Sequence, residues 1–425
     1  MPHPDFERAA KHVTAEALRS ALMEMVNISS PTGREGEMAN YLSGRLRQAG
    51  FRAQLQEVSS GRPNAVGTRR GAGDGLNLLF TGHMDTSYSG EEDFLEGMGK
   101  GFRAQAVHED GWIWGLGANN MKSGLAAALI ALEAIAKEEI SLRGDLTLAG
   151  VVGEIEKAPI EEFQGESFAG YGTGTRYLIA HGVSADCAIL AEPTRLRVCT
   201  GNMGCVWAKI TAFGKMAHSA NKKQPGHENA IEKIHRIQTA VREWIPGYGE
   251  RHKFMGERPE ATVAAVRGGL RWRLSRNPVE ASLYLDVRTV PGQTAEQVKR
   301  ELRGILRRIA ADSGDPEAEL ELYVNDPPTL IDTKLTVIQS LTSAHTELAP
   351  HISADPILRR PAADSTHFNR YDIPCAVYGP GGFTHPDAAT WMHAAGEHCA
   401  VEHLLTAARV YLAAAIDICN RPAAD

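Results

Sequence analysis

Apolar and polar positions alternate along this chain in two distinct rhythms. Apolar residues recur with helical spacing over residues 14–27 and 35–49, and a Ser-Ser-Pro-Thr-Gly break separates the two segments. Short apolar runs then alternate with helical segments: a strand that ends at His83, a helix over about 122–136, and strands over 146–153 and 187–190. This alternation is typical of a doubly wound sheet with crossover helices. We therefore predict an α/β fold with a mixed sheet.

The order of elements changes after residue 194. The pattern predicts a strand, a helix, two strands, a helix and a strand over residues 205–213, 228–244, 261–268, 281–288, 294–310 and 318–324. This order is that of a ferredoxin-like α+β unit. From about residue 325 the first alternation resumes, with helices near 334–346 and 402–418. We therefore predict one domain formed by residues 1–203 and 325–425, and an inserted domain formed by residues 204–324.

Composition narrows the class of function. A chain of 425 residues exceeds what one core usually supports, and 43% hydrophobic with 23% charged residues is typical of a soluble globular protein. The net charge of -7, without a long basic run, argues against nucleic acid as a partner. The longest apolar stretch, near residues 125–135, is too short to span a membrane, and the first residues lack the apolar run of a secretory signal. We expect a cytoplasmic protein that acts on a small molecule.

The six cysteines are scattered, and no two of them form a Cys-x-x-Cys pair. This spacing argues against a structural zinc cluster and is typical of reduced thiols in a core. Any metal in this protein must therefore be held by histidine and carboxylate groups.

Residues with catalytic chemistry follow the ends of the predicted strands. They are His83 and Asp85 after residues 78–82, a glycine-rich turn at 114–124, Glu154 after residues 146–153, Glu192 after residues 187–191, and a segment with His393 at 392–398. Ligands of open α/β sheets bind where strands end. In a strand, His83 and Asp85 would point the same way; on a loop, Asp85 would instead hold the His83 ring from behind. Taken alone, a His-x-Asp pair is more often a strand-end turn with two solvated polar residues.

Together these motifs, in this order, resemble those of the two-domain metallopeptidases and amidohydrolases. That family includes acetylornithine deacetylase, succinyl-diaminopimelate desuccinylase, aminoacylase and the bacterial glutamate carboxypeptidase. The resemblance covers residues 15–415 and implies a catalytic main domain with an inserted lid and dimerisation domain. By position it makes His83 a metal ligand and Asp85 its orienting partner. It also makes Glu154 the general base, Glu192 a carboxylate ligand of the metal that His83 binds, and His393 a ligand of the other metal.

The segment 214–220 resembles the Gly-x-x-x-His stretch of the family's lid. The resemblance implies that His218 stabilises the oxyanion in the active site of a neighbouring subunit. We therefore expect a homodimer, or a higher homo-oligomer, that assembles through the lid.

Two positions depart from the family pattern. Asn120 stands where two-metal members carry a bridging aspartate, and Ile155 stands where the carboxylate of the second metal is expected. We therefore expect one divalent metal, manganese or zinc before iron, held by His83, Glu192 and Asn120, and we disfavour a second metal. A backbone bulge that lets Glu156 replace the missing carboxylate is the alternative. His393 is then either an auxiliary ligand or a hydrogen-bond partner of the substrate.

Four further residues are candidate substrate contacts. Arg359 and Asp364 lie in a segment that resembles the family's substrate loop, where an arginine would clamp a substrate carboxylate. Gly381 lies in the glycine-rich loop after the apolar run 375–377, and Arg288 ends a lid strand. For Arg288, an ion pair that fixes the edge of the sheet is an equally good interpretation.

We expect a metal-dependent hydrolase of a C–N bond other than a standard peptide. Within the family group, 5-nitroanthranilate aminohydrolase removes an aryl amino group, and hydrolytic deamination of such an aryl amine suits a mononuclear site. The nearest alternative is an N-acyl-amino-acid amidohydrolase, a dipeptidase or a carboxypeptidase. A non-catalytic binding protein with a decayed metal site is a further alternative, but the chain keeps His83, Glu154 and His218.

Overall fold

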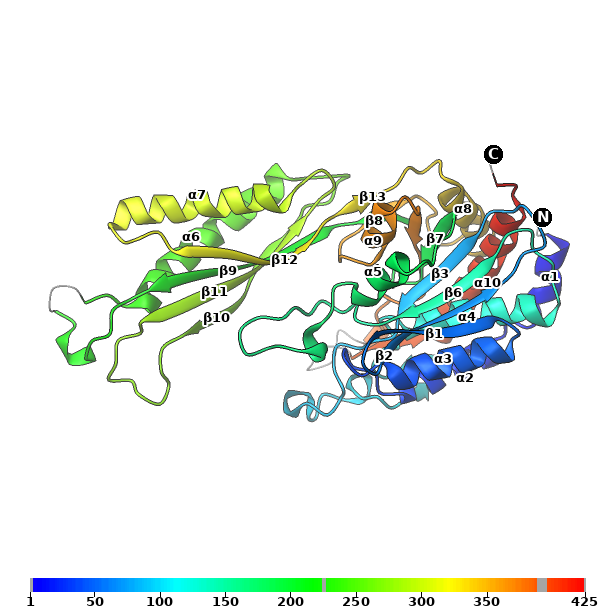
Figure 1. Cartoon of the computed structure of the whole chain (residues 1–425), viewed down its shortest axis with the longest axis horizontal. Helices are drawn as coiled ribbons and strands as arrows, with labels where there is room; N and C mark the ends of the chain where they lie inside the picture. The colour runs from blue at the N-terminus through cyan, green and yellow to red at the C-terminus, as the bar shows by residue number, and fades with distance from the viewer. Residues whose placement is uncertain (1–2, 224–226, 388–395, 424–425) are drawn as a thin grey trace. The chain divides into compact units, whose positions relative to one another are not determined.

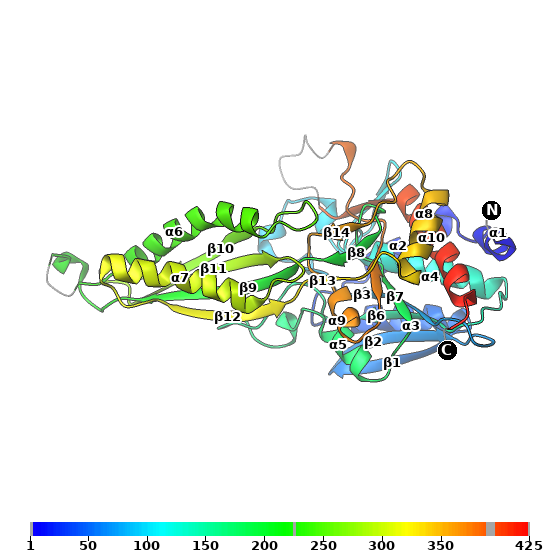
Figure 2. The same cartoon turned by 90° about the horizontal axis from the view of Figure 1, so that it is seen from above.

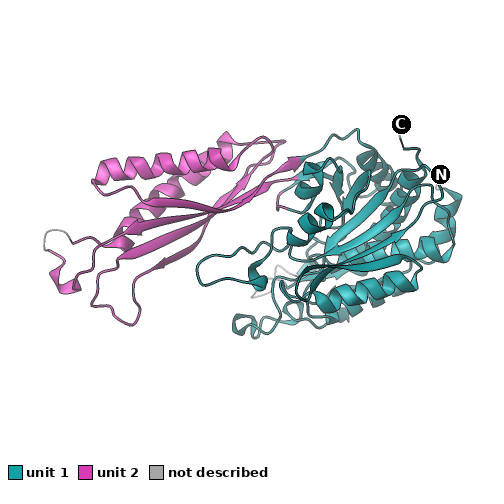
Figure 3. Cartoon of the chain, viewed as in Figure 1, with its two compact units in different colours: residues 1–201, 330–359, 363–425 teal, residues 202–329, 360–362 magenta. Residues whose placement is uncertain are grey.

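The computed structural model describes residues 3–223, 227–387 and 396–423. The chain divides into two compact units (Figure 3). Unit 1 comprises Met1–Gly201, Leu330–Arg359 and Ala363–Asp425, and unit 2 comprises Asn202–Thr329 and Arg360–Ala362. Each unit has its own buried apolar cluster, so each is described by itself.

A mixed sheet forms the centre of unit 1 (Figure 1). Its strands, in spatial order, are β1 (Arg52–Ser59), β2 (Arg62–Arg69), β6 (Leu146–Val151), β3 (Leu78–His83), β7 (Cys187–Leu190), β15 (Cys375–Val377), β8 (Cys199–Asn202) and β13 (Thr329–Leu330), and β14 (Ile357–Arg359) pairs with β8. Strand β3 runs parallel to both β6 and β7. The carboxyl ends of these three strands therefore meet at one edge of the sheet, and the residues that follow them are brought together.

The helices of unit 1 are α1 (Pro4–Ala10), α2 (Ala15–Asn27), α3 (Gly36–Gln48), α4 (Lys122–Lys137), α5 (Thr173–Ala180), α8 (Thr336–Leu348), α9 (Ser365–Arg370) and α10 (Val401–Asn420). Helix α4 consists mainly of Ala, Leu and Ile and is buried nearly all round, because it packs on β3 and between α2 and α10 (Figure 2). Three short strands, β4 (Val107–Glu109), β5 (Trp112–Trp114) and β16 (His398–Ala400), form a separate small sheet.

Unit 2 is an antiparallel sheet with two helices on one face (Figure 1). Its elements in chain order are β9 (Gly204–Phe213), α6 (Ala230–Arg251), β10 (Ala261–Gly268), β11 (Glu280–Thr289), α7 (Ala295–Ser313) and β12 (Glu319–Asp326). The spatial order of the strands is β10-β11-β9-β12. Alternate residues of β9 are buried against the helices, for example Val206, Ala208 and Ile210. This is the strand and helix order that the sequence pattern predicts.

Strands β1 and β2 have no counterpart in the sequence pattern. Strand β2 contains Pro63 and Gly67 and buries two polar side chains, Arg62 and Asn64, so its apolar signal is weak. Among the described residues, no helix is both long and apolar enough to cross a membrane.

Candidate active site

His83 is the last residue of β3, and its ring is fully buried. Its Nδ1 lies 2.9 Å from the backbone carbonyl oxygen of Asp85 and 3.5 Å from Oδ1 of the same residue. Burial opposes protonation of the His83 ring, but the negative charges of Glu154 and Glu192 raise its pKa. In the neutral form of the ring, an Nδ1–H that donates to the oxygens of Asp85 leaves Nε2 with a free lone pair. This is the tautomer that a metal-binding histidine requires.

Three oxygen atoms surround Nε2 of His83. Asn120 Oδ1 lies 3.3 Å away, Glu192 Oε1 3.4 Å and Glu154 Oε2 3.6 Å. For metal–ligand bonds of about 2.1 Å, ligand atoms at tetrahedral or octahedral positions are about 3.0 to 3.4 Å apart. The spacing around Nε2 is therefore close to that of ligands around one ion, and His83, Glu154 and Glu192 form a candidate metal site.

Glu192 follows β7, and its two carboxylate oxygens have different environments. Oε2 accepts a hydrogen bond of 2.7 Å from the guanidinium of Arg359, whereas Oε1 is buried and accepts no hydrogen bond from the described residues. A buried oxygen without a donor fits a cation. Burial opposes ionisation of Glu192, but the charge of Arg359 and the contact with His83 keep its pKa low. These residues thus fit a divalent metal.

Asn120 is held in the turn before α4 by Glu397. The carboxylate of Glu397 accepts hydrogen bonds from the backbone N–H groups of Asn119 and Asn120, at 3.3 and 2.9 Å. Lys122, at the start of α4, donates to the carbonyl oxygens of Met25 and Ile28, and its burial lowers its pKa to about 7. The backbone at Asn120 is therefore held in place, and its side-chain oxygen lies 3.3 Å from His83 Nε2.

Glu154 lies just beyond the end of β6 and is largely buried. Burial and the negative charge of Glu192 raise the pKa of its carboxyl group well above the ordinary value. Two neighbouring carboxylates whose pKa values are driven apart are suited to different tasks, one as a ligand and one as a proton carrier. The geometry therefore suits Glu154 to accept and return a proton.

Asp85 lies beyond the strand, and its carboxylate is shared between several groups. It accepts hydrogen bonds from the Thr32 hydroxyl and from the backbone N–H groups of Glu154 and Ile155. The shortest contact of the His83 ring is with the backbone of Asp85 and not with its carboxylate. Of the two arrangements that the sequence left open, the structure has the loop arrangement, with Asp85 behind the ring.

The other predicted residues of unit 1 lie near this group. Arg359 is buried on Glu192, so its Nη2 is already used by that carboxylate. Asp364 is buried and accepts a hydrogen bond of 2.5 Å from Thr175. Gly381 lies where a Cβ atom would come within 2.5 Å of the carbonyl oxygen of Asn119, so only glycine fits there.

Two predicted residues, His218 and Arg288, are not part of this group in the structure. His218 and Arg288 belong to unit 2, where the exposed His218 ring accepts a hydrogen bond from the N–H of Ala220 and Arg288 pairs with Asp286 at 2.7 Å. The ion pair of Arg288 matches the structural interpretation of that residue. His393 lies outside the described residues. Within the described residues, Glu156 is not among the carboxylates grouped with His83.

Sequence reasoning missed the groups that support the site. Arg62 is fully buried and pairs with both carboxylate oxygens of Glu35, at 2.9 and 2.7 Å. It also pairs with Glu166, and Glu35 accepts a hydrogen bond from the N–H of Gly153, next to Glu154. Glu397 was also missed as a support, although it follows His393 by four residues in the last motif.

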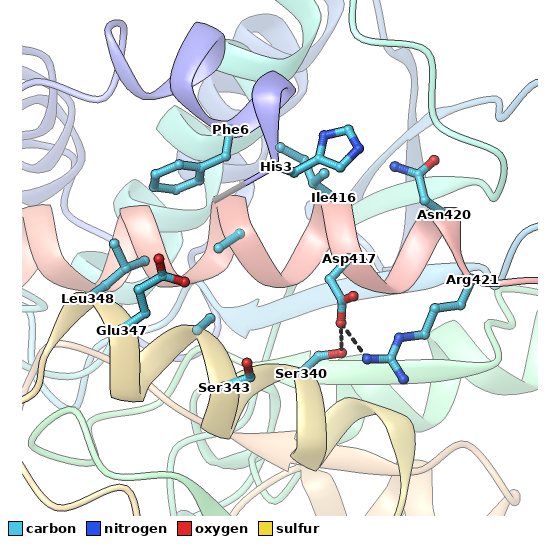
Figure 4. A pocket seen from close by; sticks show the side chains of 12 residues that line it. His3, Phe6, Ser340, Ser343, Glu347, Leu348, Ile416, Asp417, Asn420 and Arg421 are labelled. Carbon is cyan, nitrogen blue, oxygen red and sulfur yellow. Dashed lines mark hydrogen bonds and ion pairs between the residues drawn. The ribbon is translucent and has the colours of Figure 1, made fainter. Parts of the chain in front are cut away.

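A cavity of about 420 Å³ lies between α1, α8 and α10, away from the residues around His83, and its lining includes apolar side chains such as Phe6 and Leu348 (Figure 4). Three of its polar side chains pair with each other, since Asp417 accepts from Ser340 and from Arg421. It shares no lining residue with the site around His83.

The fold and the site define a two-domain metal-dependent hydrolase. Residues 79–417 match the model of peptidase family M20/M25/M40, and the chain belongs to this family. The match confirms the family resemblance that the sequence motifs indicated, and the structure confirms the predicted α/β fold. Members of the family are metal-dependent hydrolases that act on C–N bonds, and this chain is an enzyme of that class.

Individual relatives are distant in sequence but span nearly the whole chain. The N-formyl-4-amino-5-aminomethyl-2-methylpyrimidine deformylase of Bacillus subtilis is 25% identical, with 92% of each chain covered. A probable succinyl-diaminopimelate desuccinylase of Staphylococcus epidermidis is 24% identical, with 85% of this chain and 89% of the relative covered. Among solved structures, a tripeptidase of Staphylococcus aureus superposes with a TM-score of 0.76 at 19% identity, over 96% of this chain and all of the other. This last likeness shows the fold alone.

Proposed function

We propose that this enzyme hydrolyses an amide or related C–N bond in a small molecule, with one divalent metal held by His83, Asn120 and Glu192. The observation that carries the proposal is that the oxygens of Asn120 and Glu192 lie 3.3 and 3.4 Å from His83 Nε2, with the oxygen of Glu154, the proposed proton carrier, next at 3.6 Å. When bound, a divalent metal supplies Lewis acidity to the reacting groups. Manganese and zinc both suit a ligand set of nitrogen and oxygen.

Glu154 and Asp85 then have separate roles, one in proton transfer and one in positioning. Glu154 takes a proton from the attacking water and returns it to the departing nitrogen. Asp85 holds the backbone of Glu154 and fixes the ring of His83. Asp85 therefore holds the ligand His83 and the proton carrier Glu154 in fixed relative positions.

An acylated amine is the substrate class that we favour. Two relatives that match most of this chain are named for the removal of a formyl or a succinyl group from an amine. Cleavage of such a bond needs one proton carrier, which Glu154 would supply, and one electrophile-activating cation, which His83, Asn120 and Glu192 would hold. The pyrimidine of the Bacillus subtilis relative makes N-formyl aminopyrimidines a sensible first member of the panel.

Hydrolytic deamination of an aryl amine, such as 5-nitroanthranilate, is the second candidate. It is favoured by Asn120 and Ile155, which replace the two carboxylates expected in a two-metal site. Ile155 is buried and apolar and offers no ligand atom. A site restricted to one metal is the feature that separates this candidate from ordinary two-metal peptidases.

One assay separates the candidates. The protein reconstituted with manganese or with zinc is offered N-formyl, N-acetyl and N-succinyl amines, dipeptides and aryl amines, and the release of amine or ammonia is measured. We expect turnover of an acylated amine and a loss of about 10²–10⁴-fold in Glu154→Gln, with metal content unchanged. Ammonia from an aryl amine supports the second candidate. Protein that takes up no metal during reconstitution and binds members of the panel without turnover would indicate a binding protein.

We also propose that the enzyme is a homodimer that assembles through unit 2, with His218 serving the active site of the partner. Within the described residues, β10 pairs only with β11 and so forms an edge of the sheet. Large apolar side chains are exposed in the hairpin after it, with Trp272 at 77% and Leu274 at 82% exposure. An exposed edge with an apolar neighbour is typical of a surface that a second copy covers.

A further inference from the structure

The guanidinium of Arg359 is buried against a candidate metal ligand. Arg359 is the last residue of β14, and only 8% of its side chain is exposed. Its Nη2 donates to Glu192 Oε2 at 2.7 Å. A charged hydrogen bond of this length between two buried groups is strong and directional. Arg359 therefore constrains how the Glu192 carboxylate turns.

The second oxygen of the same carboxylate points to the metal site. Glu192 Oε1 lies 3.4 Å from His83 Nε2 and accepts no hydrogen bond from the described residues. Oε2 is engaged by Arg359, so Oε1, which has no hydrogen-bond partner among the described residues, is the oxygen most open to a cation. The carboxylate is thus set up to bind through one oxygen.

The backbone that carries Glu192 is fixed by two close glycine contacts. A Cβ atom on Gly124 of α4 would lie 1.8 Å from the carbonyl oxygen of Ala191, and one on Gly379 would lie 2.4 Å from the carbonyl oxygen of Glu192. Neither position tolerates a larger residue without movement. Because the main chain is held, rotation of the side chain is the remaining freedom, and Arg359 restrains that rotation.

Arg359 itself is held in the central sheet. Strand β14 pairs with β8, and the N–H of Ile357 donates to the carbonyl oxygen of Val198 at 2.9 Å. Strand β7, which leads into Glu192, belongs to the same sheet. Both partners of the ion pair are therefore carried by one rigid element, which is what a precise ligand position needs.

We propose that Arg359 is a positioning residue that fixes Glu192 as a one-oxygen ligand of a single divalent ion. It does not bind a carboxylate of the substrate, which is the role that the sequence suggested. The inference rests on the proposed function, because it needs a metal at His83 and Glu192. The charge of Arg359 also offsets the negative charge of Glu192 and favours its ionised form.

The test is metal affinity of the metal-free full-length protein, titrated with Co²⁺ by calorimetry and by visible absorption. In Arg359→Met we expect Co²⁺ to bind about 10–100-fold more weakly, with a changed absorption spectrum. In Arg359→Gln, whose side chain is polar but shorter, we also expect weaker Co²⁺ binding. This variant replaces Arg359→Met if the methionine variant does not fold. Arg360→Met is the matched control, since this neighbouring arginine is exposed and pairs with Glu257 in unit 2; its affinity and spectrum stay those of the native protein.

Two outcomes would overturn the inference. If Arg359→Met binds Co²⁺ as tightly as the native protein or more tightly, Glu192 does not depend on Arg359. If the variant instead raises only the KM for substrates that carry a carboxylate, Arg359 is a substrate clamp. Failure of the proposed function is recognised separately, because Co²⁺ binding would then also survive in His83→Ala and in Glu192→Gln.

Discussion

The carboxylate of Asp85 accepts a hydrogen bond of 3.1 Å from the backbone N–H of Glu154. Since the carbonyl of Asp85 contacts the His83 ring at 2.9 Å, one residue connects the proposed ligand to the proposed proton carrier. Strands β3 and β6 run parallel, which brings the ends of both strands within reach of this side chain. The relative position of His83 and Glu154 thus depends on Asp85.

Asp85→Asn tests this connection. The amide keeps one acceptor oxygen but turns an NH₂ group toward backbone donors, so one of them loses its partner. A buried donor without a partner costs about 1–3 kcal/mol, and we expect that loss in the free energy of unfolding measured with urea. Turnover falls as well. The exposed Asp74→Asn is the control and leaves turnover unchanged, because Asp74 pairs only with a surface arginine among the described residues. Native turnover in Asp85→Asn would show that the connection does not matter.

The buried ion pair of Arg62 and Glu35 predicts a large effect on stability. Arg62→Met leaves the carboxylate of Glu35 buried without its cation and frees Glu166. We expect a loss of about 3–5 kcal/mol in the free energy of unfolding. Arg70→Met is the matched control, since the Arg70 side chain is 78% exposed in its pair with Asp145, and it costs about 0–1 kcal/mol. Equal losses in the two variants would contradict the prediction.

Asp364 predicts a pH dependence of stability in the metal-free protein. Burial raises the pKa of its carboxyl group from 3.8 to about 7, although the Thr175 hydroxyl opposes that shift. Between these two values the folded chain keeps a proton that the unfolded chain has lost. The stability contributed by this proton therefore falls as the pH rises from about 4 to about 7, by at most about 1.4 kcal/mol per pH unit.

Asp364→Asn mimics the protonated carboxyl group at every pH. Relative to this variant, the native protein should lose stability as the pH rises through that window and then level off. Urea unfolding of both proteins at a series of pH values measures the difference. Curves that stay parallel from about pH 4 to about pH 8 would show that Asp364 titrates normally.

The exposed hairpin of unit 2 predicts the oligomeric state. We expect the native protein to sediment as a dimer, and Trp272→Asp combined with Leu274→Asp to shift it to a monomer. The monomer should keep its metal and lose turnover, since His218 would no longer reach a partner. Phe94→Asp is the control, because Phe94 is also exposed, at 64%, but belongs to unit 1. A fully active monomer would exclude a role for His218 between subunits.

Much of the fold could be predicted because its signals are local. The apolar run that ends at His83 and the 187–190 strand are observed at the predicted positions, and the β-α-β-β-α-β order of unit 2 is confirmed. Helix α6 extends to Arg251 despite Pro246, because its apolar stripe continues to pack on the sheet. Strand β2 was missed because its buried polar residues are satisfied by partners far away in the sequence, such as Arg62 by Glu35.

The ligand candidates His83, Asn120 and Glu192 and the general-base candidate Glu154 could be named because each follows a strand or precedes a helix. The side chains that hold these residues in place could not be named from the sequence. The contact of Arg359 with Glu192 joins residues 167 positions apart, and that of Glu397 with Asn120 joins residues 277 positions apart. No local pattern encodes such pairs, because they arise from strand order in the folded sheet.

The most direct test of a single-metal site is the metal content of the native protein. Protein purified without chelator is analysed for manganese, zinc and iron, and His83→Ala and Glu192→Gln are analysed in parallel. We expect about one equivalent of divalent metal per chain in the native protein and a loss of metal from both variants. Two equivalents per chain, or one equivalent that survives both substitutions, would contradict a single metal held by His83, Asn120 and Glu192.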